Sequence, residues 1–203
     1  MSHPKFAQTA VPVIDAISQR WSPYAFAAKP VAEADLQALF EAARWAASAY
    51  NEQPWRYLLA TKADQAEYDR MLSCLVEPNQ AWAKAAPVLV IGCCQLKFTL
   101  NGQTNGTALH DLGLASGNLS AEATARGLAV HQMGGILPER VKELYGLPDD
   151  VQALTAIAIG YAAEQDTLPA DVREREQAPR SRKPLSELVF SGSWNRASKI
   201  VSK

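Results

Sequence analysis

The sequence has few cysteines and no long apolar run. Its 203 residues include three cysteines, an odd number without the spacing of a metal site or a redox pair. Cys93 and Cys94 lie in an apolar run and are predicted to be buried small side chains. That run, residues 85–94, falls well below the ~20 residues of a membrane-spanning helix. The composition therefore favours a globular protein in a reducing compartment.

An excess of charge of either sign is also missing. The 20 Lys and Arg residues are balanced by 21 Asp and Glu residues, which gives a net charge of −1. Proteins that bind nucleic acid or anionic membranes usually carry a basic excess, so we expect neither partner. Residues 1–5 lead into no apolar signal segment, so we expect a cytoplasmic protein. The length suits a single domain over residues 1–203.

The motifs of several common sites are missing as well. His3, His110 and His131 are far apart, and none has a second ligand four residues away, so no metal site is predicted. The sequence has no Gly-x-Ser-x-Gly elbow, no Walker motif and no Gly-x-Gly-x-x-Gly motif after a strand. Hydrolase triads and the standard nucleotide folds are therefore disfavoured.

What the sequence does contain is a pattern of alternating helices and strands. The expected helices cover residues 11–19, 33–47, 64–75, 104–126 and 138–144, and the expected strands cover residues 55–61, 87–94, 127–131 and 153–161. The small residues of segment 104–126 fit either a central core helix or a helix at a dimer interface. Residues 162–179 are polar and predict a long loop, and the apolar residues that follow it indicate an arm that packs on another surface.

Two cationic clusters stand far apart in the chain. Arg20 and Ser22 lie on one side of an extended segment, where a guanidinium and a hydroxyl could bind a phosphate. Arg180 and Arg182 repeat this chemistry near the C-terminus. Taken singly, each cluster is more typical of exposed surface side chains.

Two further segments suit a planar polar ligand. Residues 44–55 join a helix to a strand through small and amide side chains, and we expect this loop to offer backbone N–H groups and carboxamides to a heterocycle. Gly134 and Gly135 would let backbone N–H groups approach a ring without an intervening side chain. Taken singly, this pair is also typical of a simple turn.

The order of these pieces resembles that of the nitroreductase family of FMN-dependent oxidoreductases. The matching segments are residues 20–26, 41–55, 79–82, 86–87, 127–141, 160–161 and 182–185, which together span most of the chain. Segment 41–55 is the most specific of them. The resemblance implies an α+β fold with helices around a mostly antiparallel sheet. It also implies an intertwined homodimer whose C-terminal arms, from about residue 163 to residue 203, wrap the partner.

The resemblance further implies that two FMN molecules lie at the dimer interface. The FMN-binding residues that it implies are Arg20, Trp21, Ser22, Arg180 and Arg182 toward the phosphate, Ser48, Ala49 and Asn51 from the other subunit, Gln53 and Asn79 toward the ribityl chain or ring, Tyr24 at the pyrimidine edge, and the backbone of Gly134 and Gly135 beside N5. No side chain is expected to act as a catalytic acid or base.

The activity implied by the resemblance is a ping-pong cycle. NAD(P)H would pass hydride to flavin N5 and leave, and a nitroaromatic, quinone or similar small molecule would then take its place. Tyr50 and Trp82 could line the acceptor site, although core packing is at least as typical of Trp82. A flavin-binding carrier or sensor with little turnover, and a homodimeric scaffold without flavin, are the alternatives.

Two positions depart from the family pattern. Tyr24 stands where relatives commonly place Arg or Lys near the flavin, so we expect a lower flavin potential than in those relatives. Ala47 stands where the family usually has Pro, which loosens the backbone of the loop without removing a contact.

Overall fold

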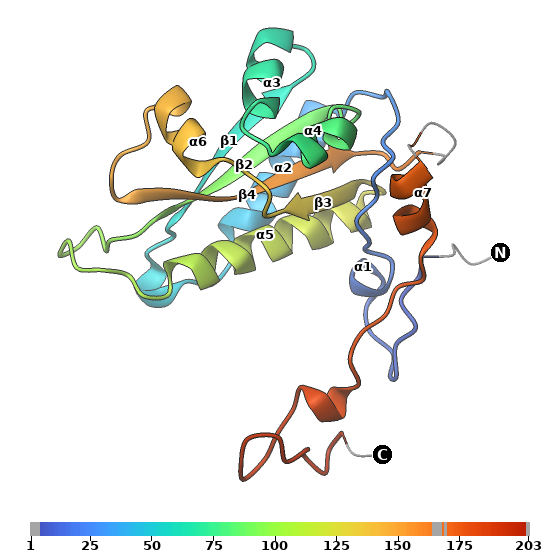
Figure 1. Ribbon diagram of the computed structural model, residues 1–203. Helices are drawn as coiled ribbons and strands as arrows, with labels where there is room; N and C mark the ends of the chain where they lie inside the picture. Colours follow the sequence, from blue (N-terminus) through green and yellow to red (C-terminus); the bar gives the residue numbers. More distant parts are fainter. Residues whose placement is uncertain (1–4, 164–167, 169, 202–203) are drawn as a thin grey trace.

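A computed structural model describes residues 5–163, 168 and 170–201 of the chain. At its centre lies a four-stranded antiparallel sheet with the strand order β1-β2-β4-β3 (Figure 1). The strands are β1 (Trp55–Thr61), β2 (Val88–Gln95), β3 (Ala129–Met133) and β4 (Val151–Gly160). The expected α+β class, with an antiparallel sheet flanked by helices, is confirmed.

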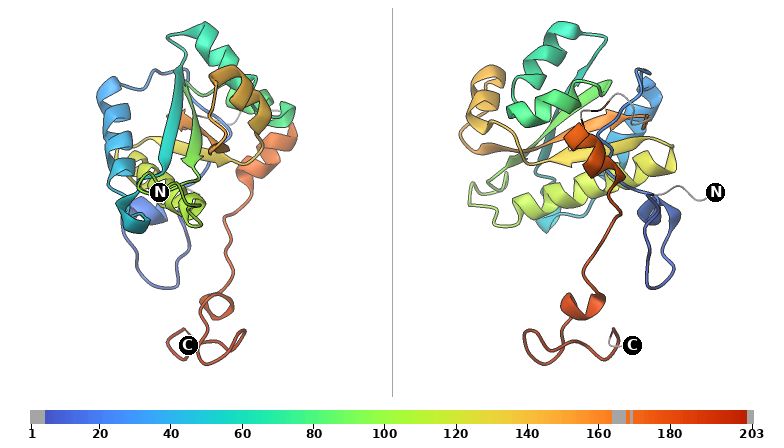
Figure 2. Two further views of the ribbon diagram at one scale, coloured as in Figure 1. Left: turned by 90° about the vertical axis from the view of Figure 1, so that its left-hand side faces the viewer. Right: turned by 45° about the vertical axis from the view of Figure 1, so that its right-hand side comes forward.

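Helices cover both faces of the sheet. One face carries α2 (Glu33–Arg44) and α5 (Ala108–Ala125), and the other carries α3 (Gln65–Leu72), α4 (Glu77–Ala83) and α6 (Pro138–Tyr145) (Figure 2). Strand β2 is buried on both faces, which explains its unbroken apolar sequence. Because side chains alternate along a strand, Val88 and Val90 pack toward α2 and α5, whereas Leu89 and Ile91 pack toward the other layer.

The predicted burial of the two adjacent cysteines is confirmed. Cys93 and Cys94 point to opposite faces of β2 and both belong to the core. Burial is the main cause that raises the pKa of each to about 11, so both are thiols at neutral pH.

Two sequence-based predictions about helices were wrong. The helix expected over residues 11–19 is reduced to α1 (Asp15–Ser18), and the apolar side chains of Val11 and Ile14 are exposed. The loop expected over residues 162–179 contains α7 (Ala170–Gln177), whose polar sequence has no apolar periodicity. Helix α4 was also missed, because its seven residues are too few to show a helical period.

The C-terminal segment leaves the body of the protein after α7 (Figures 1 and 2). We call residues 180–201 the C-terminal arm. It includes a short 3-10 helix, Leu185–Glu187, and an isolated bridge between Phe190 and Ala197. Its exposed apolar side chains are Leu185, Leu188, Val189, Trp194 and Ile200. In the described part of the chain, no helix is both long and apolar enough to cross a membrane.

Candidate functional site

The fold brings the two cationic clusters together, although they are about 160 residues apart. Arg20 donates from Nη1 to Ser22 Oγ at 3.1 Å. Burial is the largest cause that lowers the pKa of Arg20, and the positive charges of Arg180 and Arg182 lower it further. The pKa of Arg180 is lowered by burial and then by Arg182. Three guanidinium groups that repel one another in this way form a site that a phosphate would stabilise.

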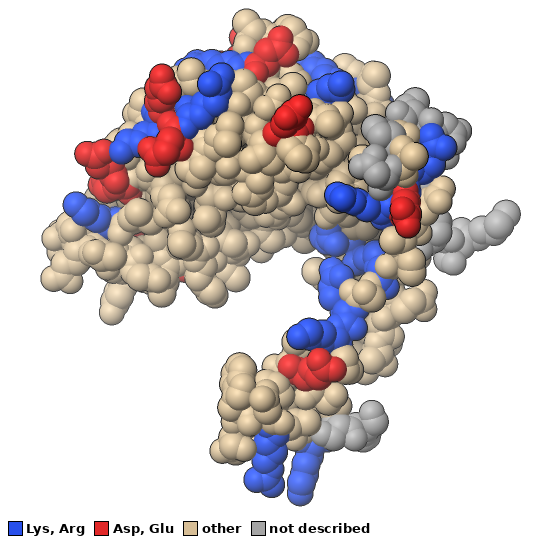
Figure 3. Space-filling model, in the orientation of Figure 1, with Lys and Arg blue, Asp and Glu red and all other residues tan. Residues whose placement is uncertain are grey.

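The C-terminal arm is tied to the start of the chain at this cluster. Arg180 Nη1 donates to the carbonyl oxygens of Lys5 (2.8 Å) and Ser18 (2.9 Å). Trp21 is half-buried, lies 5.7 Å from Lys5 Nζ by its ring centroid, and lines a cavity of about 190 Å³ with Arg20 and others. Figure 3 shows Lys and Arg side chains along the segment that joins the body to the arm.

Tyr24 is fixed between the body and α7. Its backbone N–H donates to Oε2 of Glu176 at 2.8 Å, and its ring packs edge-on against Trp82 and His131, with centroids 5.1 and 4.7 Å away. His131 Nδ1 lies 2.8 Å from the carbonyl oxygen of Pro23, which identifies Nδ1 as the protonated nitrogen. Burial is the largest cause that lowers the pKa of His131, so the ring is neutral at pH 7.

Trp82 packs in the core, where only 4% of its surface is exposed. Of the two roles considered for Trp82, core packing is the one that the structure shows. Tyr50 differs, because it is 95% exposed and touches the ring of Phe98 edge-on at 5.8 Å.

Gly135 and Asn79 form a close contact near the end of β3. Asn79 Nδ2 and the backbone N–H of Val76 both donate to the carbonyl oxygen of Gly135, at 3.0 and 3.1 Å. A Cβ atom at Gly135 would lie 2.4 Å from Asn79 Nδ2 and 2.8 Å from a methyl group of Val76, so only glycine fits. At the exposed Gly134 a Cβ atom would meet no described atom within 4 Å.

The loop from Ser48 to Gln53 has an unusual backbone. Tyr50, Asn51 and Gln53 have φ angles of 52°, 55° and 52°, in the left-handed region that non-glycine residues rarely adopt. The backbone N–H groups of Asn51 and Gln53 donate to the carbonyl and hydroxyl oxygens of Ser48, at 3.1 and 3.0 Å. The backbone N–H of Ala49 donates to a neighbouring helix, as described next.

A buried carboxylate in α5 holds this loop. Asp111 accepts the backbone N–H of Ala49 at Oδ2, at 3.1 Å, and its side chain is 4% exposed. The expectation that these backbone N–H groups are offered to a ligand was therefore wrong for Ala49, Asn51 and Gln53. The left-handed turn and Asp111 already use them. Gln53 also donates from Nε2 to the carbonyl oxygen of Asn51, at 3.1 Å, whereas the side chain of Asn51 is exposed.

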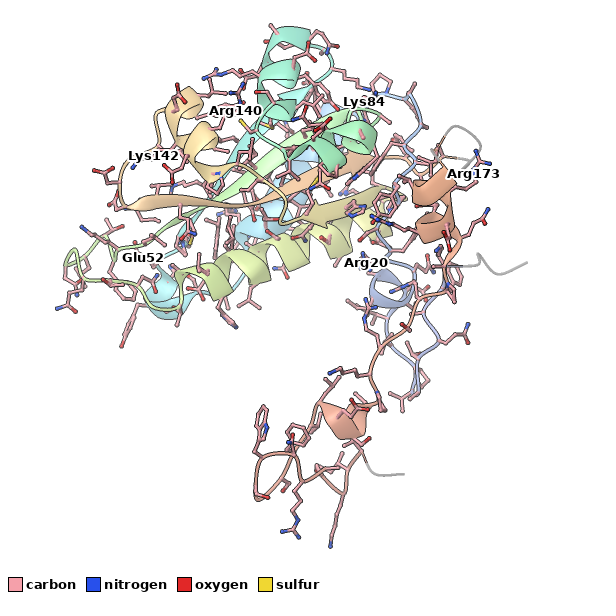
Figure 4. The ribbon with its side chains drawn as sticks, viewed as in Figure 1. Arg20, Glu52, Lys84, Arg140, Lys142 and Arg173 are labelled. Atoms are coloured by element: carbon pink, nitrogen blue, oxygen red, sulfur yellow. The ribbon has the colours of Figure 1, made fainter. Side chains whose placement is uncertain are left out.

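The loop and the arginine cluster lie at opposite ends of α5. Ala49 contacts Asp111 near the start of the helix, whereas Arg20 and Trp21 share a cavity with Thr124 near its end. Between Asp111 and Thr124 the helix rises about 20 Å at ~1.5 Å per residue. In Figure 4 the labelled residues Glu52 and Arg20 lie toward opposite ends of α5. The loop residues and the arginine cluster thus form two separate groups within the chain.

The described residues contain no group of three or more His, Cys, Asp or Glu side chains that could hold a metal ion. His110 is exposed and lies 3.3 Å from Asp111 by its Nδ1 atom. The groups that could bind a ligand at the candidate site are guanidinium, hydroxyl, amide and backbone groups.

Comparison with known proteins identifies relatives of this arrangement. The model of the family described as Nitroreductase family matches residues 17–161. An uncharacterized 15.4 kDa protein of Mycolicibacterium smegmatis is 33% identical in an alignment of 138 residues that covers 66% of this chain and 90% of that protein. The FMN reductase (NAD(P)H) of Bacillus subtilis (strain 168) is 28% identical in an alignment of 170 residues that covers 75% of this chain and 67% of that protein. A crystal structure described as an oxidoreductase containing FMN is 35% identical, with a TM-score of 0.86 over 92% of this chain and 94% of the other.

The contact between Gly135 and Asn79 generates a prediction about stability. Gly135→Ala should destabilise the protein by about 1–3 kcal/mol, because the added methyl group overlaps Asn79 and Val76. Gly134→Ala is the matched control and should change the stability by less than about 0.5 kcal/mol. Urea unfolding of both variants without added ligand measures the difference. Equal stability of the two variants would contradict the packing argument.

Proposed function

This chain belongs to the nitroreductase family, and from that premise we propose that it is an FMN-dependent oxidoreductase that uses NAD(P)H. The observation that carries the proposal is the convergence of Arg20, which donates to Ser22, with Arg180 and Arg182. These residues fit a flavin phosphate in charge, in hydrogen-bonding capacity and in their shared location. The names of two relatives, one an FMN reductase and one an oxidoreductase containing FMN, point to the same cofactor.

We also propose that the working form is a homodimer. Helix α5 exposes Leu109 and Leu114, and at Gly113 and Gly117 a Cβ atom would meet no described atom within 4 Å. A second helix could therefore approach this face closely. The C-terminal arm adds a further set of exposed apolar side chains away from the body. Such surfaces are costly to leave in water, and a second copy of the chain would bury them.

A two-fold dimer would also join the two separated groups of residues. If the α5 helices of the two subunits run antiparallel, the start of one helix lies beside the end of the other. The Ser48, Ala49 and Asn51 loop of one subunit would then reach the arginine cluster of its partner. The separation of about 20 Å along α5 within one subunit supports this arrangement.

When bound, FMN would accept hydride from NAD(P)H at N5 and deliver it to a nitroaromatic, quinone or similar acceptor in a ping-pong cycle. The protein would hold FMN in position. Gly134 would leave room beside the ring. Asn79, which its hydrogen bond to Gly135 orients, would hold the ribityl chain or ring together with Gln53. Tyr24 would face the pyrimidine edge, and the exposed Tyr50 would line the acceptor site.

Anaerobic titration of the FMN-loaded protein with NADH and with NADPH tests this function. The flavin absorbance should bleach with one of the two nucleotides and return when a nitroaromatic or quinone is added. A flavin-binding carrier or sensor would take up FMN but show little turnover. A protein that takes up no FMN would contradict the proposal.

The arginine cluster predicts a difference between two flavins. Arg182→Gln should weaken FMN binding by about tenfold to hundredfold, since a hydrogen bond to a charged group is worth about 1.5–3 kcal/mol. The affinity for riboflavin, which has no phosphate, should not change. Lys183→Gln makes the same change of charge at the next residue and should preserve FMN affinity. Isothermal titration of the apoprotein with each flavin measures these constants, and equal losses for the two flavins would contradict a phosphate-binding role.

The identity of residue 24 predicts an effect on the flavin potential. Tyr24→Arg should raise the midpoint potential, because a cation favours the anionic reduced flavin. The rise should be about 30 mV for each tenfold gain in affinity for the reduced form. Tyr24→Phe, which adds no charge, is the control. Spectroelectrochemistry gives the potentials, and an unchanged or lower value for Tyr24→Arg would argue against the role assigned to this position.

A further inference from the structure

A tight loop between β2 and α5 projects from the body beside the start of α5 (Figure 1). We call residues 97–104 the β2–α5 loop, and its ends pair through an isolated bridge between Lys97 and Thr104. The backbone N–H of Phe98 donates to the carbonyl oxygen of Gln103 at 2.8 Å, and the N–H of Gly102 donates to that of Phe98 at 2.9 Å. These hydrogen bonds give the loop a defined shape although it contains no helix or strand.

Glu52 ties this loop to the turn from Ser48 to Gln53. Its Oε1 atom accepts the backbone N–H of Thr99 at 2.9 Å and also accepts the Thr99 hydroxyl. These two hydrogen bonds are the largest causes that lower the pKa of Glu52, so its carboxylate is charged at neutral pH. A charged acceptor with two donors makes a strong link between the two segments.

The same two segments share an aromatic contact. The ring of Tyr50 meets the ring of Phe98 edge-on, with centroids 5.8 Å apart and planes inclined by 82°. Tyr50 remains 95% exposed, and Phe98 is half-buried. Tyr50 also has a left-handed φ of 52°, which is costly for a bulky side chain. The chain thus strains its backbone to hold a ring that gains little burial in return, and such strain is typical of ligand sites.

We propose that Phe98 and Tyr50 together form a wall of the acceptor site that selects flat aromatic acceptors, and that Glu52 is a positioning residue for this wall. The inference rests on the proposed function, in which the turn that contains Tyr50 lies beside FMN. Two rings at nearly right angles present a face and an edge, so an aromatic molecule can stack on one ring while it meets the edge of the other. A small inorganic oxidant gains nothing from such a wall.

The first test removes the ring of Phe98. Phe98→Leu keeps an apolar side chain, so the loop should keep its shape. The dissociation constant of 1,4-naphthoquinone for the oxidised FMN-loaded protein, read from the change in flavin absorbance without NAD(P)H, should rise about two- to tenfold. The ratio of kcat/KM for naphthoquinone to that for ferricyanide should fall by the same factor. Leu100→Ala, at the exposed tip of the same loop, is the matched control and should change neither quantity.

The second test loosens the loop. Glu52→Ala removes the acceptor of both Thr99 donors, so the Thr99 amide should exchange its hydrogen faster and the naphthoquinone dissociation constant should rise as in Phe98→Leu. Glu52→Gln, whose amide oxygen can still accept from Thr99, should restore much of the affinity. Faster exchange in Glu52→Ala without any change in naphthoquinone affinity would overturn the positioning role of Glu52.

A further variant covers the case in which Phe98→Leu does not fold. Tyr50→Gly removes the other ring, and glycine adopts the left-handed conformation without strain. It should weaken naphthoquinone binding in the same direction. Unchanged binding in FMN-loaded Phe98→Leu or Tyr50→Gly protein would overturn the inference, also where sedimentation shows a weaker dimer, since the rings would then serve the subunit interface. Failure of the proposed function is distinct from this result, because wild-type protein would then take up no FMN.

Discussion

The burial of β2 on both faces is the constraint on which the rest of the structure depends. This strand pairs along its length with β1 and β4, and its side chains alternate between two apolar layers. A strand used in this way has no polar group to spare for a ligand. The groups that can bind one are therefore found where the chain leaves the sandwich: at the ends of α5, in the segment before α2, after β3 and in the C-terminal arm.

Binding groups from such distant segments need interactions that hold them close to one another. Three guanidinium groups repel one another at the junction of body and arm, and the bonds from Arg180 to the Lys5 and Ser18 carbonyls keep the arm there despite this repulsion. The residual repulsion would favour an anion at the junction, as the proposed flavin phosphate requires. Part of the free energy gained by packing the apolar core thus offsets the repulsion among these arginines. Such an arrangement is common where a protein binds phosphate.

Much of the fold follows from the sequence, whereas the shape of the site does not. The strand at residues 55–61 was predicted to the residue, because bulky aromatic and aliphatic side chains that follow a proline define it locally. The chemistry of Arg20 and Arg180 was also visible, but their proximity followed only from the family resemblance, since it depends on contacts across about 160 residues. Helix α7 was missed because it has no apolar stripe: one apolar side chain, Val172, and the Glu176 carboxylate dock it. Tyr50, Asn51 and Gln53 have left-handed backbone conformations although none of them is a glycine. Their local sequence therefore does not predict that conformation.

The same kind of interaction occurs at the loop from Ser48 to Gln53 and at the segment that contains Tyr24. Asp111 accepts the backbone N–H of Ala49, and Glu176 accepts the backbone N–H of Tyr24, in each case from an element distant in sequence. A buried carboxylate that accepts a backbone N–H fixes the main chain strongly, because a charged acceptor makes the stronger bond and its release would leave a buried charge without its partner. The strained loop and the Tyr24 segment are therefore shaped before any ligand arrives. Such preorganisation reduces the entropy lost on binding.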